Sequence, residues 1–166
     1  MAQVDDRLGN ILRKLGGLGP GLAADPSTLK QLTELMPRAD RDQLLRSALI
    51  HEGWLYVGSG EELFLPAASQ RENVILAQRT ARRKCTNLAS LAILAIPFLR
   101  ERAKPAWVLS GGQKRILSIV VACLLAPKGL LLHRPFEELD DDNKAALKQW
   151  LEKAGEEISI LSDASD

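Results

Sequence analysis

The sequence predicts a helix-rich α/β domain built around a parallel sheet. Two apolar runs in the last third of the chain, 130–133 and 158–162, flank an amphipathic segment over 141–154. Strand, helix and strand in this order pair the two strands in parallel through a crossover helix. Elsewhere apolar residues recur at helical spacing, and 166 residues fit a single domain that spans 1–166.

The first third of the chain is predicted to form helices that are separated by turn residues. Three helices are expected, over 4–15, 26–36 and 40–51. Gly16-Gly17 ends the first helix, and residues 16–24 are predicted to be a loop. Asp25 followed by Pro26 is a strong helix start, with Asp25 as the N-cap.

The middle of the chain combines a turn with further helices. WLYVGSGEELFLP, residues 54–66, is predicted to form two short strands around a Gly-Ser-Gly turn. Residues 69–102 are predicted to be mostly helical, with a break near Asn87 and a bend at Pro97. A helix is expected from about Gly111 to Ala126.

An apolar run over 88–99 is too short to cross a bilayer, which takes about 20 residues. We expect it to be a helix packed under the helix that begins near Gly111. Four of its side chains are predicted to be mostly inaccessible: Leu88, Leu91, Leu94 and Ile96.

Composition limits the classes of function. Lysine and arginine number 22 against 21 acidic residues, so no basic excess favours nucleic acid. Cys85 and Cys123 lie in apolar helical stretches and are predicted to be buried thiols of a reducing compartment. The polar, acid-containing N-terminus is unlike a signal peptide, so a cytoplasmic location is expected. Two histidines and two cysteines without paired spacing predict no metal site.

One stretch carries residues suited to phosphate. Ser110, Gly111, Gly112 and Gln113 place a hydroxyl, two residues without side chains and an amide directly before a helix. Backbone N–H groups and the helix dipole can face an anion closely at such a loop. Because Gly112 lies at a helix start, a side chain there is expected to leave the chain's own core untouched.

Residues 106–163 resemble the ATP-binding cassette (ABC) family. LSGGQ is that family's signature loop, and LLLHRPFEELD (130–140) aligns without a gap with its usual LLLDEPTSALD. His133 then stands where the family has a magnesium-associated Asp, and Arg134 where it has the Glu that polarises water. Asp140 falls on the D-loop aspartate. SILSDAS resembles IVVTHD and puts Asp163 at the switch histidine.

The resemblance extends upstream with further replacements. GPGLAADPSTLKQLTELMP (19–37) resembles the phosphate loop and its helix, with Pro26 in place of the lysine. Pro26 removes a backbone donor and a charge. The carboxylate of Asp25 would fill the anion site and repel a phosphate. Residues 56–74 resemble the glutamine-loop region, with Ser59 at the glutamine position.

The resemblance implies a shortened, degenerate domain of the P-loop NTPase type with a helical subdomain. A pseudo-ATPase of this kind would bind no nucleotide tightly and would share ATP only with a partner. In the family the signature loop faces a nucleotide held by the opposite domain, so Ser110 to Gln113 would contact a partner's γ-phosphate and Asp140 would lie at the dimer seam. The implied partners are an intact ABC ATPase or a second copy of this chain, with peripheral contact to a membrane transporter subunit.

Two other functions remain open. Residues 26–65 also fit a winged helix, an adaptor or nucleic-acid-binding module, in which Lys30, Arg41 and Arg46 give a modest basic face that nearby acids offset. A weakly active ATPase subunit of an ABC transporter is the third hypothesis.

Overall fold

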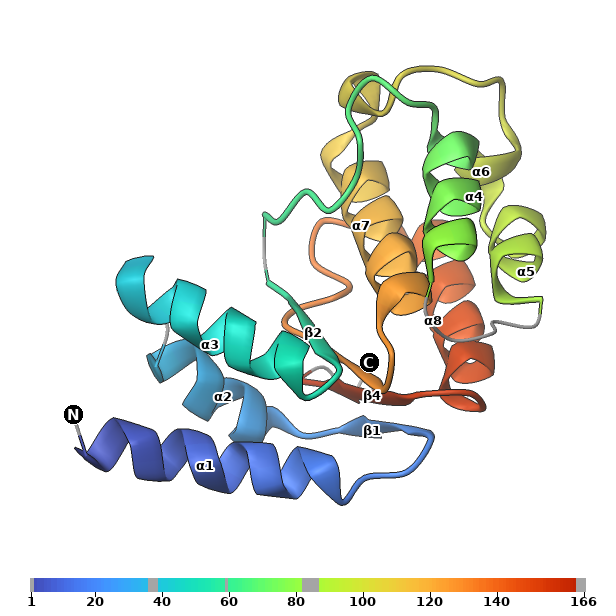
Figure 1. Ribbon diagram of the computed structural model, residues 1–166. Helices are drawn as coiled ribbons and strands as arrows, with labels where there is room; N and C mark the ends of the chain where they lie inside the picture. The colour runs from blue at the N-terminus through green and yellow to red at the C-terminus, as the bar shows by residue number, and fades with distance from the viewer. Residues whose placement is uncertain (1, 36–38, 59, 82–86, 164–166) are drawn as a thin grey trace.

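A parallel sheet with helices on both faces forms the body of the molecule in the computed structural model, which describes residues 2–35, 39–58, 60–81 and 87–163 (Figure 1). Its strands are β1 (Gly21–Ala24), β2 (Trp54–Val57), β3 (Gly129–Leu132) and β4 (Ser159–Ser162). They lie in the order β1-β4-β3-β2, and every neighbouring pair is parallel. The predicted α/β class with a parallel sheet is confirmed.

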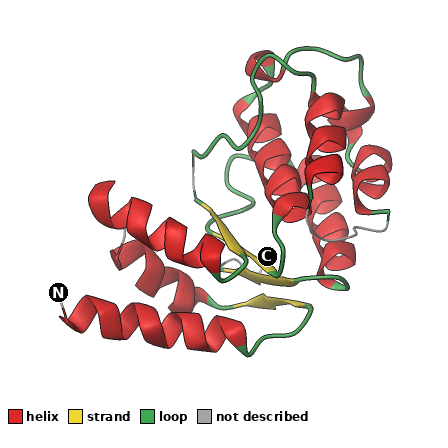
Figure 2. Ribbon diagram, viewed as in Figure 1, coloured by secondary structure: helices red, strands yellow, loops and turns green. Residues whose placement is uncertain are grey.

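Helices divide between the two faces of the sheet, as Figure 2 shows. One face carries α1 (Ala2–Gly16), α2 (Pro26–Leu35) and α3 (Ala39–His51). Packed on the other face and beyond it are α4 (Gln70–Thr80), α5 (Leu88–Ala95), α6 (Pro97–Arg100), the short 3₁₀ helix η1 (Ala106–Val108), α7 (Gly111–Leu125) and α8 (Asp141–Gly155). This second group includes α4, α5 and α6, which lie within the stretch 69–102 that the sequence predicts to be mostly helical.

Strand β3 is covered on both sides, which explains its unbroken run of leucines. Leu130 and Leu132 belong to the core under α7 and α8, whereas Leu131 belongs to the core under α1 to α3. A strand buried on both faces needs apolar side chains at every position. The predicted crossover is also confirmed, because α8 connects β3 to its parallel neighbour β4.

The prediction of a loop over 16–24 is wrong for its second half. Residues Gly21 to Ala24 form β1 and pair in register with Ser159 to Ser162. A four-residue segment of glycine, leucine and alanine has little intrinsic strand preference, so its pairing with β4 makes it a strand.

The predicted hairpin over 54–66 is also wrong. Only 54–57 forms a strand, and it pairs in parallel with β3; the described residues from Gly60 to Pro66 contain no strand. The Trp54 ring lies against Gly129, where a Cβ would be 2.5 Å from the ring. The hairpin on which the winged-helix hypothesis depends is therefore absent from the described part of 26–65.

The apolar run 88–99 forms α5 and α6, and only part of it is buried. Leu88 and Ile96 are inaccessible as predicted, but Leu91 is 38% and Leu94 65% exposed. Helix α5 lies at the outside of the second layer, where it packs against α8, α4 and α7 and buries a single stripe.

Two smaller expectations concern burial. Cys123 is buried as predicted, whereas Cys85 lies outside the described residues. Within the described ranges, no helix has the length and apolar content needed to cross a membrane.

Candidate functional site

The carboxyl ends of the strands bring the predicted site residues together. Asp25 follows β1, and its N–H donates to the carbonyl of Ser162 at 2.7 Å. His133 follows β3 and donates its N–H to Val57 at 3.0 Å, while Asp163 follows β4. In open parallel sheets ligands bind beyond these strand ends. The sheet therefore places Asp25, His133 and Asp163 where a ligand site is expected.

The start of α2 is filled by the chain's own side chains. The Thr28 N–H donates to Asp25 Oδ1 at 3.0 Å, and the Thr28 hydroxyl donates to Asp25 Oδ2 at 2.8 Å. Lys14, from α1, donates from Nζ to Asp25 Oδ2 at 2.5 Å and to Thr28 Oγ1 at 2.7 Å. A carboxylate thus occupies the position at the helix N-terminus where an anion would otherwise bind.

Electrostatics keep this carboxylate ionised. Partial burial alone would raise the pKa of Asp25, but hydrogen bonds from Lys14 and Thr28 outweigh it, so the pKa lies below its ordinary value. The sequence identified Asp25 as the cap but gave no sign of Lys14. Lys14 belongs to α1 and meets Asp25 and Thr28 at the start of α2 only once the chain is folded.

The residues at the ends of β3 and β4 are engaged with each other. His133 Nδ1 hydrogen-bonds Asp163 Oδ2, and the backbone N–H of Arg134 donates to Asp163 Oδ1 at 2.7 Å. The Arg134 backbone has φ of +48°, and its exposed side chain pairs with Glu137 at 3.5 Å. Asp163 therefore joins the two residues that follow β3, a contact that the sequence did not indicate.

At the start of α7 the cap is neutral. The Gln113 N–H donates to Ser110 Oγ at 3.2 Å, and the Ser110 N–H donates to Gln113 Oε1 at 3.1 Å. This reciprocal capping box leaves the Ser110 hydroxyl proton able to donate outward. The N–H groups of Gly111 and Gly112 have no partner among the described residues.

The two glycines of this loop are not equivalent. A Cβ on Gly111 would meet only Glu138 Oε2, at 3.5 Å, whereas one on Gly112 would lie 3.0 Å from the Glu138 carbonyl oxygen and 3.3 Å from Leu139 Cδ2. The expectation that a side chain at Gly112 leaves the chain's own core untouched is not supported, because Leu139, which packs against the core, would be pressed by it. A Cβ at Gly111 would make an ordinary van der Waals contact, whereas at Gly112 the neighbouring atoms would have to shift by a few tenths of an ångström.

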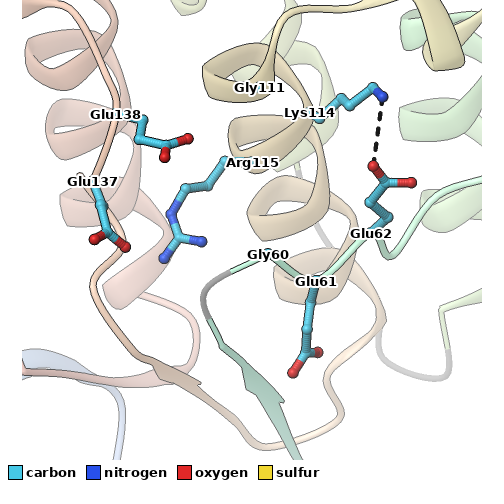
Figure 3. A pocket seen from close by; sticks show the side chains of 8 residues that line it. All are labelled: Gly60, Glu61, Glu62, Gly111, Lys114, Arg115, Glu137 and Glu138. Carbon is cyan, nitrogen blue, oxygen red and sulfur yellow. Dashed lines mark ion pairs between the residues drawn. The ribbon is translucent and has the colours of Figure 1, made fainter.

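A charged cavity of about 170 Å³ opens beside the α7 start, between segment 60–62 and the turn at Glu137-Glu138 (Figure 3). On its wall Lys114 pairs with Glu62 at 3.5 Å. Glu138 places its carboxylate next to Gly111, where it opposes an approaching anion.

Arg115 is the buried cation of this cavity and was not predicted. Its guanidinium donates to the carbonyls of Gly58 at 3.3 Å and His133 at 2.6 Å, and also to that of Arg134. Its Nε has no hydrogen-bond partner among the described residues. Burial lowers the pKa of Arg115, while Glu137 and Glu138 partly oppose that effect. Arg115 thereby ties α7 to the ends of β2 and β3.

The other predicted positions are placed as follows. Asp140 is exposed and caps α8, accepting from the Asn143 N–H and Nδ2 at 2.8 Å each, which lowers its pKa. Pro26 is the exposed first residue of α2. Ser59 lies outside the described residues. Among the described residues no group of three or more His, Cys, Asp or Glu is arranged to hold a metal ion.

An apolar groove runs along the C-terminal half of α7. One part, of about 390 Å³, lies between Leu63 to Leu65, α4 and Val121; an adjoining part of about 260 Å³ reaches Ile50 and Tyr56. Leu63 and Leu125 line both parts. The groove is separate from the charged cavity, which lies at the N-terminal end of the same helix.

Comparison with known proteins finds similar sequences and a similar fold. The sulfate/thiosulfate import ATP-binding protein CysA of Ralstonia nicotianae is 32% identical over 74 residues, which is 45% of this chain and 19% of that protein. The protein of the same name from Vibrio vulnificus is 34% identical over 85 residues, 51% of this chain and 24% of that one. A solved ATP-binding subunit of an ABC transporter superposes with a TM-score of 0.55 at 16% identity, covering 87% of this chain and 67% of the other.

The chain is similar to ABC transporter ATP-binding subunits. The sequence alignments cover less than a quarter of the CysA proteins' length. No protein-family model matches the chain. The structural likeness, at 16% identity, supports the fold.

Proposed function

We propose that this chain is a non-hydrolysing ABC ATPase-like domain that partners or regulates an intact ABC ATPase and offers its signature loop to the nucleotide held by that partner. One observation carries the proposal. The start of α2 is filled by Asp25 and Lys14, whereas the start of α7 keeps backbone donors that have no partner within the described part of the chain.

The proposal holds that the chain's own nucleotide site is inactive. A phosphate at α2 would have to displace the Asp25 carboxylate, which both Thr28 and Lys14 hold in place. At the strand ends His133 and Asp163 satisfy each other, and Arg134 stands where water activation would need a base. Loss of general-base assistance alone typically costs ~10²–10⁴ in rate.

The signature loop supplies what remains useful. The N–H groups of Gly111 and Gly112 and the hydroxyl of Ser110 form a small donor set at a helix N-terminus, which suits a terminal phosphate. In this proposal ATP is shared between two chains, Gln113 holds the loop in shape through its bond to Ser110, and Asp140 lies at the seam. Glu138 weakens the site because its carboxylate lies beside Gly111.

Contact with a membrane transporter subunit would use a different surface. The apolar groove beside α7 exposes leucines at Leu63, Leu65 and Leu76, and exposed apolar surface of this kind marks interaction sites. Under this proposal the chain could dock to a membrane subunit through the groove while its signature loop faces the ATPase.

The test is association in solution. Each intact ABC ATPase of the source organism, with its hydrolysis blocked by mutation, is mixed with this chain and analysed by sedimentation with and without ATP. We expect a complex that requires ATP. Gly111→Asp should abolish it, because the new carboxylate would repel a phosphate in a poorly solvated seam. Glu138→Gln should strengthen it, because a repelling charge is removed.

Lys148→Asp, a change at an exposed position on α8, is the control for an added carboxylate and should leave association unchanged. If the complex forms equally well without ATP and with Gly111→Asp, the signature loop has no part in the mechanism. If no complex forms under any condition, the partner role is refuted.

A further inference from the structure

Strand β1 is an edge of the sheet that the described residues leave uncovered. It pairs with β4 on one side, and all four of its residues are exposed (Figure 1). Edge strands of soluble proteins are commonly shielded by charged side chains, proline or a covering element. Gly21 to Ala24 contains no charge and no proline, and shortness is its main protection.

The hydrogen-bonding direction of each residue in β1 follows from the contacts with β4. The N–H of Gly21 donates to Ile158 at 3.1 Å and the N–H of Asp25 to Ser162 at 2.7 Å. Residues 21, 23 and 25 therefore face β4, and the N–H and C=O groups of Leu22 and Ala24 point away from the sheet. These outward groups have no protein partner among the described residues. They are donors and acceptors suited to an added strand.

The strand is complementary to a copy of itself. If two β1 strands meet antiparallel about a two-fold axis at Ala23, Leu22 lies opposite Ala24 of the second copy, and each such pair exchanges two hydrogen bonds. The Leu22 side chain lies beside Gly155 of α8 and is 40% exposed. A large side chain then covers a small one at both pairs, and no like charges are brought together.

We propose that β1 pairs with β1 of a second copy of this chain, joining two sheets into one. This surface lies at the opposite end of the molecule from the signature loop (Figure 1). The inference is independent of the function proposed above. Because the paired segment is short, the dimer should be weak, with a dissociation constant on the order of 10–100 µM.

The test is sedimentation equilibrium of the full chain without nucleotide. Protein concentrations should run from roughly ten times below to ten times above the expected dissociation constant. The mass should rise from 18.2 kDa toward twice that value. Leu22→Lys should weaken association by about tenfold or more, because edge lysines oppose strand pairing. Ala24→Pro should have the same effect, since it removes an outward N–H and keeps the bonds to β4.

Leu94→Lys is the matched control, because Leu94 is an exposed leucine on α5, away from β1, and this variant should dimerise like the parent. Gly111→Asp should also dimerise normally, which separates this inference from the signature-loop proposal. Circular dichroism must show native folding in each variant. A parent chain that stays monomeric throughout, or a Leu22→Lys variant that dimerises like the parent, would overturn the inference.

Discussion

Helices α2 and α7 both begin with N–H groups that could hold an anion, and the chain caps the two starts differently. At α2 the cap is the charged Asp25, which Lys14 neutralises from α1. At α7 the cap is the neutral pair of Ser110 and Gln113, followed by two glycines. A charged cap closes a helix N-terminus to external anions, whereas a neutral cap leaves its field and donors available.

The two starts are also anchored differently. Lys14 reaches the α2 start from a helix on the outer layer and is itself half exposed. Arg115 holds the α7 start from inside, through the backbone carbonyls of three residues at the ends of β2 and β3. Buried, charge-assisted bonds fix geometry more strongly than exposed ones. We therefore expect the N-terminus of α7 to be more firmly anchored than that of α2.

The largest expected effect is loss of that anchor. Arg115→Leu should lower the free energy of unfolding by about 2–4 kcal/mol, because buried carbonyls lose their donors. Arg115→Lys should cost less, since an ammonium keeps the charge but cannot span all the acceptors. Urea unfolding measures both. A cost below about 1 kcal/mol for Arg115→Leu would mean that α7 is held by apolar packing alone.

A smaller loss of stability is expected when the cap at the N-terminus of α2 is removed. Asp25→Ala should cost about 1–2 kcal/mol near neutral pH, which is the usual loss for an N-cap. Chemical denaturation of the variant beside the parent gives the difference. An unchanged stability would show that the Asp25–Lys14 pair contributes nothing to the α2 start.

The pH dependence of this difference has a defined sign. The pKa of Asp25 is lower in the folded chain than in the unfolded one, so the stability it provides is present above the unfolded value of about 3.9 and is lost as the pH falls through the folded pKa. The gap between the parent and Asp25→Ala should therefore be constant at neutral pH and shrink under acid. In a Lys14→Met background the part of the gap that depends on pH should be smaller, because the folded pKa of Asp25 then lies closer to its unfolded value.

The smallest effect distinguishes the two glycines. Gly112→Ala should destabilise by about 1 kcal/mol, because the methyl group would press on the Glu138 carbonyl. Gly111→Ala should be neutral or stabilising by about 0.5 kcal/mol, because it restricts the unfolded chain and meets no backbone atom in the folded one. Thermal unfolding of the two variants gives the comparison, and equal values would remove the distinction between the two positions.

Local signals in the sequence predicted the helices, the Asp25 cap and the parallel β3–β4 pair, because capping residues and apolar spacing act over a few positions. Strand β1 escaped prediction since its residues favour no strand until β4 pairs with them. The segment 61–66 was misassigned because its three consecutive apolar residues, Leu63 to Leu65, lie in a loop beside α7 and not in a hairpin.

The candidate site divides in the same way. Resemblance pointed to His133, Arg134 and Asp163 as separate replacements, and only the fold shows that Asp163 contacts both of the others. Lys14 and Arg115 could not be found from spacing, because each contacts elements that are distant in sequence. Glu138 beside Gly111 likewise depends on how the turn after β3 packs on α7.

The most direct measurement is calorimetric titration of the isolated chain with Mg·ATP, paired with a phosphate-release assay. The N-terminus of α2 is occupied by Asp25 and Lys14, and His133 and Asp163 are bonded to each other. We therefore expect no binding of Mg·ATP tighter than about 1 mM and no phosphate release above that of denatured protein. Micromolar affinity with turnover would contradict the account and identify the chain as a weakly active ATPase subunit.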